Sequence, residues 1–412
     1  MTQKLFTRNF MLLILGQLTS LFGNFILKLA LSMYVLEVTG SAAIFAGILS
    51  VATIPTIVLS PLGGILADRA DRRNIMVALD ALTGVSVLCA SLFLSESNAI
   101  AVISTLLMIL SILGAFETPT VQACIPTMLQ GDNIMKGNAV VNQAASLSYL
   151  IAPMLGGVLY AMFGLKPVMY ASVVCFFITA LFECFIKLSF QRIPNQGGML
   201  QIVKQDFLSS MQYLSKEQAA ISKMLLLTAF ARFFVMGITI VGLPFLVRAH
   251  LGFNAKYYGA AESALAAATI LGSIAAGILA EKLKIHTLSF LLAALGIFMI
   301  PAGIVFLLPV NAMIKYGVTV VSFCGMQAVI SIFSIFAVSL IQQRTPNHFI
   351  GKVMAYTATV TLCVQPLGQT VYGFLFDRFH SAVYFVLIPT GIIVCIVGLS
   401  ATRFFRNMEV CE

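Results

Sequence analysis

The sequence predicts an all-α membrane protein with twelve transmembrane helices arranged as two pseudo-symmetric six-helix bundles. Three observations support this fold class: the chain is very apolar, long apolar stretches recur along it, and its two halves share short repeats. Of its 412 residues, 60% are hydrophobic and only 9% are charged. A soluble domain carries about 25% charged residues, so most of this protein's surface must face lipid rather than water.

Twelve stretches are long and apolar enough to cross a bilayer, which requires about 20 residues of helix. In order, they cover residues 9–36, 42–66, 75–95, 99–127, 138–163, 167–188, 222–248, 256–280, 286–309, 312–341, 352–376 and 381–402. Short loops separate all of them except the sixth and the seventh. We therefore expect an N-terminal bundle at residues 1–190, a cytoplasmic linker at 191–221 and a C-terminal bundle at 222–412.

The long linker carries a helical pattern of its own. Val203, Phe207, Met211 and Leu214 recur near the positions i, i+4, i+8 and i+11 of one helical face. This pattern predicts a short amphipathic helix that lies on the membrane surface. An ordinary linker without lipid contact explains the pattern equally well, and both interpretations stay open.

Lys and Arg residues are distributed unevenly between the two sets of loops. Seventeen lie on the side that holds both termini and five on the other side, while Lys28 and Arg232, inside spans, complete the 24. Cytoplasmic loops collect Lys and Arg, so both termini are expected on the cytoplasmic side of the cell membrane. The same bias explains the net charge of +9. Nucleic-acid binding is excluded because no basic face with interleaved aromatic residues occurs.

An internal repeat relates the two halves of the chain. Residues 64–68 (Gly-Ile-Leu-Ala-Asp) recur as residues 277–281 (Gly-Ile-Leu-Ala-Glu), at an offset of 213. Pro153 recurs as Pro366 at the same offset. Such repeats occur in transporters whose two bundles are related by an axis along the membrane normal, with the substrate site between them near the midplane.

The loop between the second and third spans carries the most specific motif. It consists of Gly64, Asp68, Arg69, Arg72 and Arg73. Its spacing resembles the loop signature of the major facilitator superfamily, which usually has glycine where this chain has Asp71. The resemblance implies a latch that holds one face of a transporter closed, with glycine allowing helices to approach and Asp68 capping a helix or pairing with Arg. The simpler interpretation is a topology signal of positive charge, which would not require Gly64 or Asp68.

A second motif lies in the fifth span. It consists of Ala152, Pro153, Gly156 and Gly157. These residues resemble the antiporter motif of the superfamily, a Gly-Pro pair followed by Gly-Gly, with Ala152 in place of the first glycine. Proline kinks the span, and the small residues admit a neighbouring helix. In the family this motif accompanies export. Short stretches at residues 16–17, 39–42, 115–119 and 351–353 resemble the macrolide-efflux-like permease branch, and the family resemblance spans nearly the whole chain. That branch is itself similar to siderophore exporters, so the resemblance does not fix the substrate.

Ionisable side chains inside spans are the candidates for substrate binding or proton coupling, because a charge in the bilayer is unfavourable and marks function. They are Lys28, Glu117, Arg232, Asp80 and Glu262, in spans one, four, seven, three and eight. Drug-proton antiporters of the superfamily usually carry an Arg in span four, where this chain has Leu110. In the family, spans one, four and seven line the cavity, so Lys28, Glu117 and Arg232 are expected to face it.

Glu117 is the best-placed proton carrier, because it lies roughly 15 Å deep at 1.5 Å of rise per residue. Arg232 lies at a similar depth, and its movement relative to Glu117 would load and release a proton. The alternatives are a structural ion pair between these two residues, a snorkelled Lys28, and structural roles for Asp80 and Glu262. Glu183, near the end of the sixth span, receives no role.

The expected function is secondary active efflux of a drug-like or siderophore-like small molecule by alternating access, driven by protons. An uptake permease of the same fold is the alternative. A polytopic membrane enzyme is more remote, because no cluster of catalytic groups occurs at one face. No Walker motif indicates ATP hydrolysis, and the eight cysteines lack metal-binding spacing. We therefore expect no cofactor and no metal, a small-molecule substrate, a proton and the lipid bilayer as partners, no nucleic acid, and a monomer.

Overall fold

Helices form every regular element in the described part of the chain. The computed structural model describes residues 5–130, 132–188, 219–279, 284–345 and 350–410. Within these ranges no strand occurs, and each predicted span corresponds to a helix. The predicted all-α fold is therefore confirmed. The predicted amphipathic helix of the linker lies outside the described residues.

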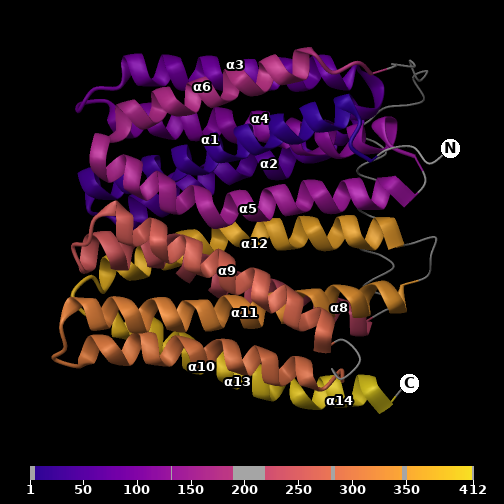
Figure 1. Cartoon of the computed structure of the whole chain (residues 1–412). Coiled ribbons are helices and arrows are strands. Elements are labelled where there is room, and N and C mark those ends of the chain that lie inside the picture. Colours follow the sequence, from indigo (N-terminus) through magenta and orange to yellow (C-terminus); the bar gives the residue numbers. More distant parts are fainter. Residues whose placement is uncertain (1–4, 131, 189–218, 280–283, 346–349, 411–412) are drawn as a thin grey trace. The chain divides into compact units, whose positions relative to one another are not determined.

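The helices of the first half lie within a few residues of the predicted spans (Figure 1). They are α1 (Arg8–Thr39), α2 (Ala42–Arg69), α3 (Arg72–Phe93), α4 (Ala99–Met128), α5 (Asp132–Phe163) and α6 (Leu165–Cys184). Two of the turns between them depend on glycine. Gly40 follows α1 with φ 62°, and Gly164 follows α5 with φ 75°. Glycine adopts this left-handed conformation without a steric penalty, so it ends both helices sharply.

The second half of the chain contains a further set of helices. They are α8 (Ala219–Met236), η1 (Gly237–Gly242), η2 (Phe245–His250), α9 (Ala255–Leu279), α10 (Thr287–Leu307), α11 (Ala312–Arg344), α12 (Ile350–Arg378), α13 (Tyr384–Ser400) and α14 (Thr402–Val410). The seventh predicted span is α-helical only in α8 and continues as the two π-helical segments η1 and η2. Pro244 separates these segments and lacks the N–H that a regular α-helix would use. The apolar pattern gave no signal of this change in winding.

Eleven helices of the described chain are long and apolar enough to cross a membrane. They include all the predicted spans except the eleventh, which corresponds to α12. That helix has 29 residues, so it is long enough to cross a membrane, and its lower hydropathy separates it from the other eleven. It contains Gln365 and Gln369 and ends on Asp377 and Arg378, and these residues lower its hydropathy.

The chain divides into two compact units. The first residues of α2 and of α9 each belong to a different unit from the rest of their helix. The first unit contains α1 and α3–α6, with α2 from residue 51 and α9 up to residue 263. The second contains residues 39–50, at the start of α2, together with α8, η1, η2, the rest of α9 and α10–α14. Both α2 and α9 therefore belong partly to each unit. The predicted domain limits at residues 190 and 222 flank a segment outside the described ranges.

Within the first unit, α1 packs closely against α6. Ser172 Oγ donates to the carbonyl of Gly23 at 3.1 Å, and Thr179 Oγ1 donates to the carbonyl of Gly16 at 3.1 Å. A Cβ at Gly23 would meet Cys175 Cβ at 2.9 Å, closer than real Cβ atoms approach one another. Small residues thus allow the close approach of the two helices. In Figure 1, α6 also runs beside α3, and the two helices share extensive contacts.

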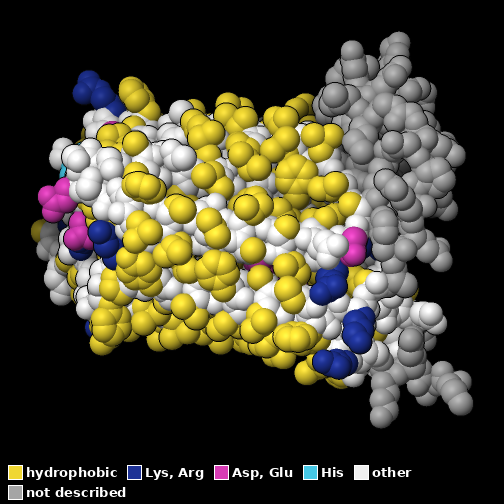
Figure 2. All heavy atoms as spheres, turned by 90° about the horizontal axis from the view of Figure 1, so that it is seen from above, with side chains coloured by type: hydrophobic (Ala, Val, Ile, Leu, Met, Phe, Trp, Pro, Cys, Tyr) yellow, Lys and Arg dark blue, Asp and Glu magenta, His cyan; other side chains and the backbone are white. Residues whose placement is uncertain are grey.

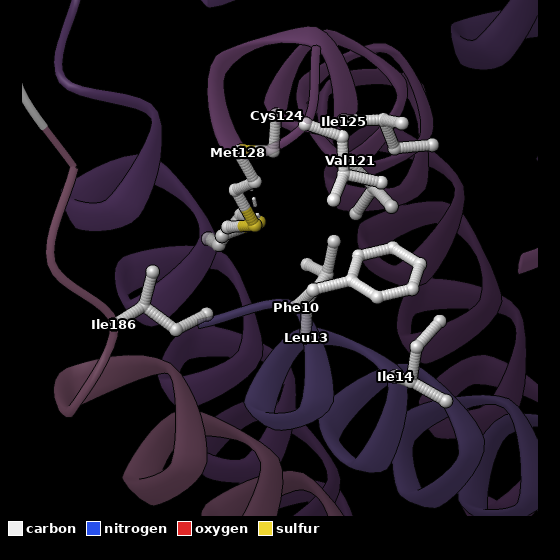
Figure 3. Close-up of a cluster of buried hydrophobic side chains, with 10 residues drawn as sticks. Phe10, Leu13, Ile14, Val121, Cys124, Ile125, Met128 and Ile186 are labelled. Carbon is white, nitrogen blue, oxygen red and sulfur yellow. Dashed lines mark hydrogen bonds between the residues drawn. The ribbon is translucent and has the colours of Figure 1, made fainter. Parts of the chain in front are cut away.

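A buried apolar cluster joins four segments of the first unit. Figure 3 shows Phe10, Leu13 and Ile14 from α1, Val121, Cys124, Ile125 and Met128 from α4, and Ile186, which follows α6. Met76 of α3 and Leu129 complete the cluster. Met76 Sδ lies 3.8 Å from Cys124 Sγ. Packing of this kind fixes the end of α3 that follows the α2–α3 loop.

Hydrophobic side chains cover the middle of the face shown in Figure 2, and charged side chains gather toward its two ends. Large apolar residues on α3 and α6 are among the exposed ones. Examples are Leu82, Leu92 and Phe93 on α3, and Val174 and Leu181 on α6, which are between 52% and 72% exposed. Exposed apolar side chains of this size on long helices are the surface expected against lipid.

Candidate functional site

The α2–α3 loop, which holds the predicted latch, is shorter than the sequence indicated. Helix α2 continues to Arg69, so Asp68 lies in its last turn, and α3 begins at Arg72. The cap of α3 is Asp71, whose side chain accepts a hydrogen bond from the Arg73 amide at 3.1 Å. The residue that departs from the family pattern thus has a local role as an N-cap. The side chains of Asp68 and Arg69 lie outside the described part of the structure.

The two arginines at the start of α3 tie it to its neighbours. Arg72 Nε donates to the carbonyl of Ala67 in α2 at 2.7 Å. Arg73 donates from its guanidinium to the carbonyl of Cys184 at the end of α6. These bonds join the ends of three helices of the motif region. A charge signal for topology alone would not require such contacts.

The close glycine contact of this region is made by Gly63 rather than Gly64. A Cβ at Gly64 would meet no atom within 4 Å, whereas one at Gly63 would collide with the carbonyl oxygen of Ala115 in α4. The sequence identified the correct turn of α2 but could not distinguish the two adjacent glycines, because which one faces α4 depends on the rotation of the helix.

The motif of the fifth span forms a close crossing between α5 and the start of α9. Ala152, Pro153, Gly156 and Gly157 are all buried. A Cβ at Gly157 would collide with the carbonyl of Ala255, and one at Gly259 would collide with the carbonyl of Pro153. Gly156 lies against α1, where a Cβ would meet the Cα of Ile26 at 3.1 Å. The predicted close packing by these small residues is therefore present, and its partners are α9 and α1.

The first unit also contains a cluster of buried carboxyls. Ser20 Oγ of α1 lies 3.0 Å from Asp80 Oδ1 of α3 and 3.4 Å from Glu117 Oε1 of α4. Asp80 is only 1% exposed. The structure thus brings together two of the residues that were selected from the sequence, and it does so through a hydroxyl group from a third helix.

Glu183 of α6 completes this cluster, although the sequence gave it no role. Its carboxyl lies within hydrogen-bonding reach of the Asp80 carboxyl, and its side chain is 1% exposed. Gly16 of α1 faces it, with the Cβ position 3.7 Å from Glu183 Cγ. Its position near a helix end suggested a residue close to the surface. The close packing of α1 on α6, which buries it, was not visible in the apolar pattern.

Lys28 is the cation that the structure associates with Glu117. Both belong to the first unit, and the Lys28 ammonium is close enough to interact electrostatically with the Glu117 carboxyl. The Lys28 side chain is exposed although it lies well inside α1. The sequence had assigned this partnership to Arg232. That residue belongs to the second unit, and its Nε is buried without a hydrogen-bond partner.

Glu262, the remaining candidate, forms a local pair within α9. Tyr258 donates its hydroxyl proton to Glu262 Oε1, one helical turn apart. Both residues belong to the part of α9 that packs with the first unit. Glu262 is not part of the contacts that join Asp80, Glu117 and Glu183.

Asp377, at the end of α12, is a further charged residue that sequence reasoning missed. Its carboxylate accepts hydrogen bonds from Ser41 Oγ at 2.5 Å, from the Ala42 amide at 2.6 Å and from the Ala43 amide at 3.1 Å. A carboxylate is favourable at the positive end of a helix, and this one satisfies the unpaired amides at the start of α2. Along the same two helices, Ser50 Oγ donates to the carbonyl of Pro366 at 3.0 Å.

Proteins from several bacteria are similar to most or to half of this chain. Macrolide efflux protein A of Streptococcus pyogenes is 25% identical over 388 residues, which cover 92% of each chain. The enterobactin exporter EntS of Citrobacter koseri is 22% identical over 325 residues, or 76% of this chain and 71% of that one. The staphyloferrin A transporter of Staphylococcus aureus is 25% identical over 209 residues, half of each chain.

Solved transporter structures share the fold. The nucleoside transporter NupG superposes with a TM-score of 0.75 at 12% identity and covers 97% of this chain and 99% of its own. A bacterial homologue of the iron transporter ferroportin gives 0.72 at 14% identity, with coverage of 96% and 98%. Finally, the sequence profile of the Major Facilitator Superfamily matches residues 13–368. With its loop motif and this match over most of its length, the chain belongs to the Major Facilitator Superfamily.

Proposed function

We propose that this multi-pass membrane transporter exports a drug-like or siderophore-like small molecule from the cytoplasm by alternating access, in exchange for protons. The observation that carries the proposal is the similarity to Macrolide efflux protein A over 92% of both chains. The small-residue motif of α5 supports the direction of transport, because it packs α5 against α9 in the manner expected of the antiporter motif. The enterobactin exporter and the staphyloferrin A transporter extend the substrate class to siderophores.

Glu117 is proposed as the residue that carries the coupling proton. It is partly buried in α4, and both Ser20 and Lys28 interact with its carboxyl. A carboxylate next to an ammonium is stabilised in its charged form, and removal of the ammonium favours protonation. Movement of Lys28 relative to Glu117 during alternating access would therefore load and release a proton. This replaces Arg232, the cation suggested by the sequence, with one from the same unit as Glu117.

The α2–α3 motif is proposed to act as the latch of the cytoplasmic face. Its described part supports this role, since Arg72 and Arg73 bond to carbonyls of α2 and α6. Gly64, Asp68 and Arg69 complete the motif. The orientation rests on the excess of Lys and Arg in the loops that would face the cytoplasm.

A transport assay tests this proposal directly. Cells that lack their own exporters would express the protein and be loaded with labelled macrolides, other amphiphilic drugs or catecholate siderophores. Expression is expected to lower the accumulation of at least one compound, and a protonophore should abolish that effect. Increased accumulation would instead indicate uptake. Export that continues at the same rate without a proton gradient would contradict proton coupling.

A further inference from the structure

We propose that Asp80 and Glu183 form a second proton-binding site, in which the two carboxyls share one proton, and that Ser20 connects this site to Glu117. The inference rests on the proposed proton coupling and adds a location where a proton is held before it reaches Glu117. It assigns a role to Glu183.

Two oxygens of the pair have no hydrogen-bond donor among the described residues. The two carboxyls lie within hydrogen-bonding reach of each other. Asp80 Oδ2 and Glu183 Oε2 are both buried, and neither has a hydrogen-bond partner. An ionised carboxylate only accepts hydrogen bonds, so two ionised groups in contact would repel each other. One shared proton replaces that repulsion with a charge-assisted O–H···O⁻ bond, which is among the stronger hydrogen bonds in proteins.

The charged groups around the pair do not remove this repulsion. Glu117 on α4 acts on the pair, and Lys28 on α1 acts on Glu117. Arg73 lies at the start of α3, the helix of Asp80, and its guanidinium donates to the carbonyl of Cys184. The ammonium of Lys28 thus acts on one of the three carboxyls, that of Glu117. Burial of unpaired charges costs several kcal/mol for each ion, and bound protons avoid that cost.

Members of the apolar cluster of Figure 3 lie close in sequence to each of the three carboxyls. Met76 lies one helical turn before Asp80 on α3, Val121 one turn after Glu117 on α4, and Ile186 three residues after Glu183. These three residues are nearly inaccessible to solvent. We infer that these apolar side chains limit the access of water to the pair from the end of α3 that begins at Arg72. A site with little water favours the binding of a proton over the binding of a hydrated cation. No group of three His, Cys, Asp or Glu residues suited to a metal ion occurs in the described part of the chain.

Ser20 provides the route between the pair and Glu117. Its hydroxyl lies 3.0 Å from Asp80 Oδ1 and 3.4 Å from Glu117 Oε1, and a hydroxyl can donate one hydrogen bond while it accepts others. In the transfer, the protonated Asp80 carboxyl gives its proton to Ser20 Oγ, while the original Ser20 hydroxyl proton passes to the Glu117 carboxylate. One O–H bond breaks and one forms at Ser20. The net result is one proton moved from Asp80 to Glu117, with the hydroxyl regenerated.

Infrared difference spectroscopy of the purified full-length protein tests the site without a transport assay. At neutral pH the wild-type protein is expected to show the carbonyl stretch of a protonated carboxyl. Asp80→Asn and Glu183→Gln should each remove that band, because the new amide donates to the remaining carboxylate and replaces the shared proton. Glu262→Gln serves as the matched control, since Glu262 is a buried carboxyl outside this cluster. A band that persists in both Asp80→Asn and Glu183→Gln would overturn the proposal.

A second variant keeps the test decisive where the first two fail to fold. The double variant Glu117→Gln with Glu262→Gln leaves the pair intact and is expected to keep the band. Absence of the band in this double variant would also overturn the shared proton.

Failure of the proposed function would give a different result. Substrate added to the wild-type protein would then release no proton into a weakly buffered solution, whatever the infrared band shows. Ser20→Ala should keep the band and slow that proton release at least tenfold, and unchanged release would remove Ser20 from the route.

Discussion

At the scale of single residues, burial and local contacts distinguish ionisable groups that look alike in the sequence. Lys28 and Glu117 interact within one unit, whereas Glu262 pairs with Tyr258 one turn away. All three looked alike in the sequence, as charges inside apolar runs. The structure separates them because helix rotation and tertiary contacts, rather than apolar spacing, determine each partner.

Substitution of Glu117 tests its role as the proton carrier. Glu117→Gln is expected to abolish uphill export but to keep substrate binding and downhill exchange, because the amide cannot release a proton. Glu117→Asp should retain part of the uphill activity, since it keeps the carboxyl on a shorter side chain. Export and counterflow in membrane vesicles would measure both properties. Uphill transport by Glu117→Gln at the wild-type rate would exclude Glu117 as the carrier.

Substitutions of the two aspartates of the α2–α3 region, Asp71 and Asp68, are expected to affect different properties, stability for the first and transport for the second. Asp71→Ala removes the N-cap of α3 and should lower the free energy of unfolding by about 0.5–2 kcal/mol, whereas Asp71→Asn keeps the acceptor and most of the stability. Asp68→Asn should instead reduce transport at normal membrane abundance, because loss of a charged hydrogen bond costs about 1.5–3 kcal/mol. Thermal unfolding and transport assays separate the two effects. Unchanged transport in Asp68→Asn would favour the interpretation of the loop as a topology signal.

At the scale of elements, the same arrangement occurs in both units. In the first, the carbonyl of Pro153 in α5 lies against Gly259 at the start of α9. In the second, the carbonyl of Pro366 in α12 accepts a hydrogen bond from Ser50 near the start of α2. Pro153 and Pro366 are the residues related by the offset of 213 in the sequence repeat. The repeat therefore preserves a proline-containing helix that packs against the beginning of another helix.

Replacing a glycine by alanine where α5 crosses α9 tests whether transport and stability require the close contact of these two helices. Gly157→Ala places a Cβ against the carbonyl of Ala255, and the backbone must move to accommodate it. We expect reduced transport and a lower melting temperature, because small residues are required where helix backbones meet. Gly317→Ala in α11 is the matched control, since a Cβ there meets no atom within 4 Å. Equal behaviour of the two variants would show that the α5–α9 crossing tolerates a wider separation.

At the scale of the whole molecule, the sequence predicted the helices well and the site only in part. Apolar runs of about 20 residues define spans because lipid leaves few alternatives for the backbone, so even α12 was found. The π-helical winding of η1 and η2, the cap at Asp71 and the burial of Glu183 were not predicted. The change in winding occurs around Pro244, the cap at Asp71 is a local side-chain contact, and the burial of Glu183 depends on the packing of α1 against α6. None of the three leaves a periodic signal.

The orientation of the molecule in the membrane is the last prediction, and it follows from the 17 Lys and Arg residues on one side against five on the other. An even number of spans puts both termini on one side, and the charge bias places that side in the cytoplasm. A reporter that is active only in the cytoplasm should therefore be active when fused after Arg406. The same reporter fused near Leu165, between α5 and α6, should be inactive. A periplasmic or extracellular reporter at the same two points provides the reciprocal control. Reversed activities would place the α2–α3 motif outside the cell, and a cytoplasmic latch would then be impossible.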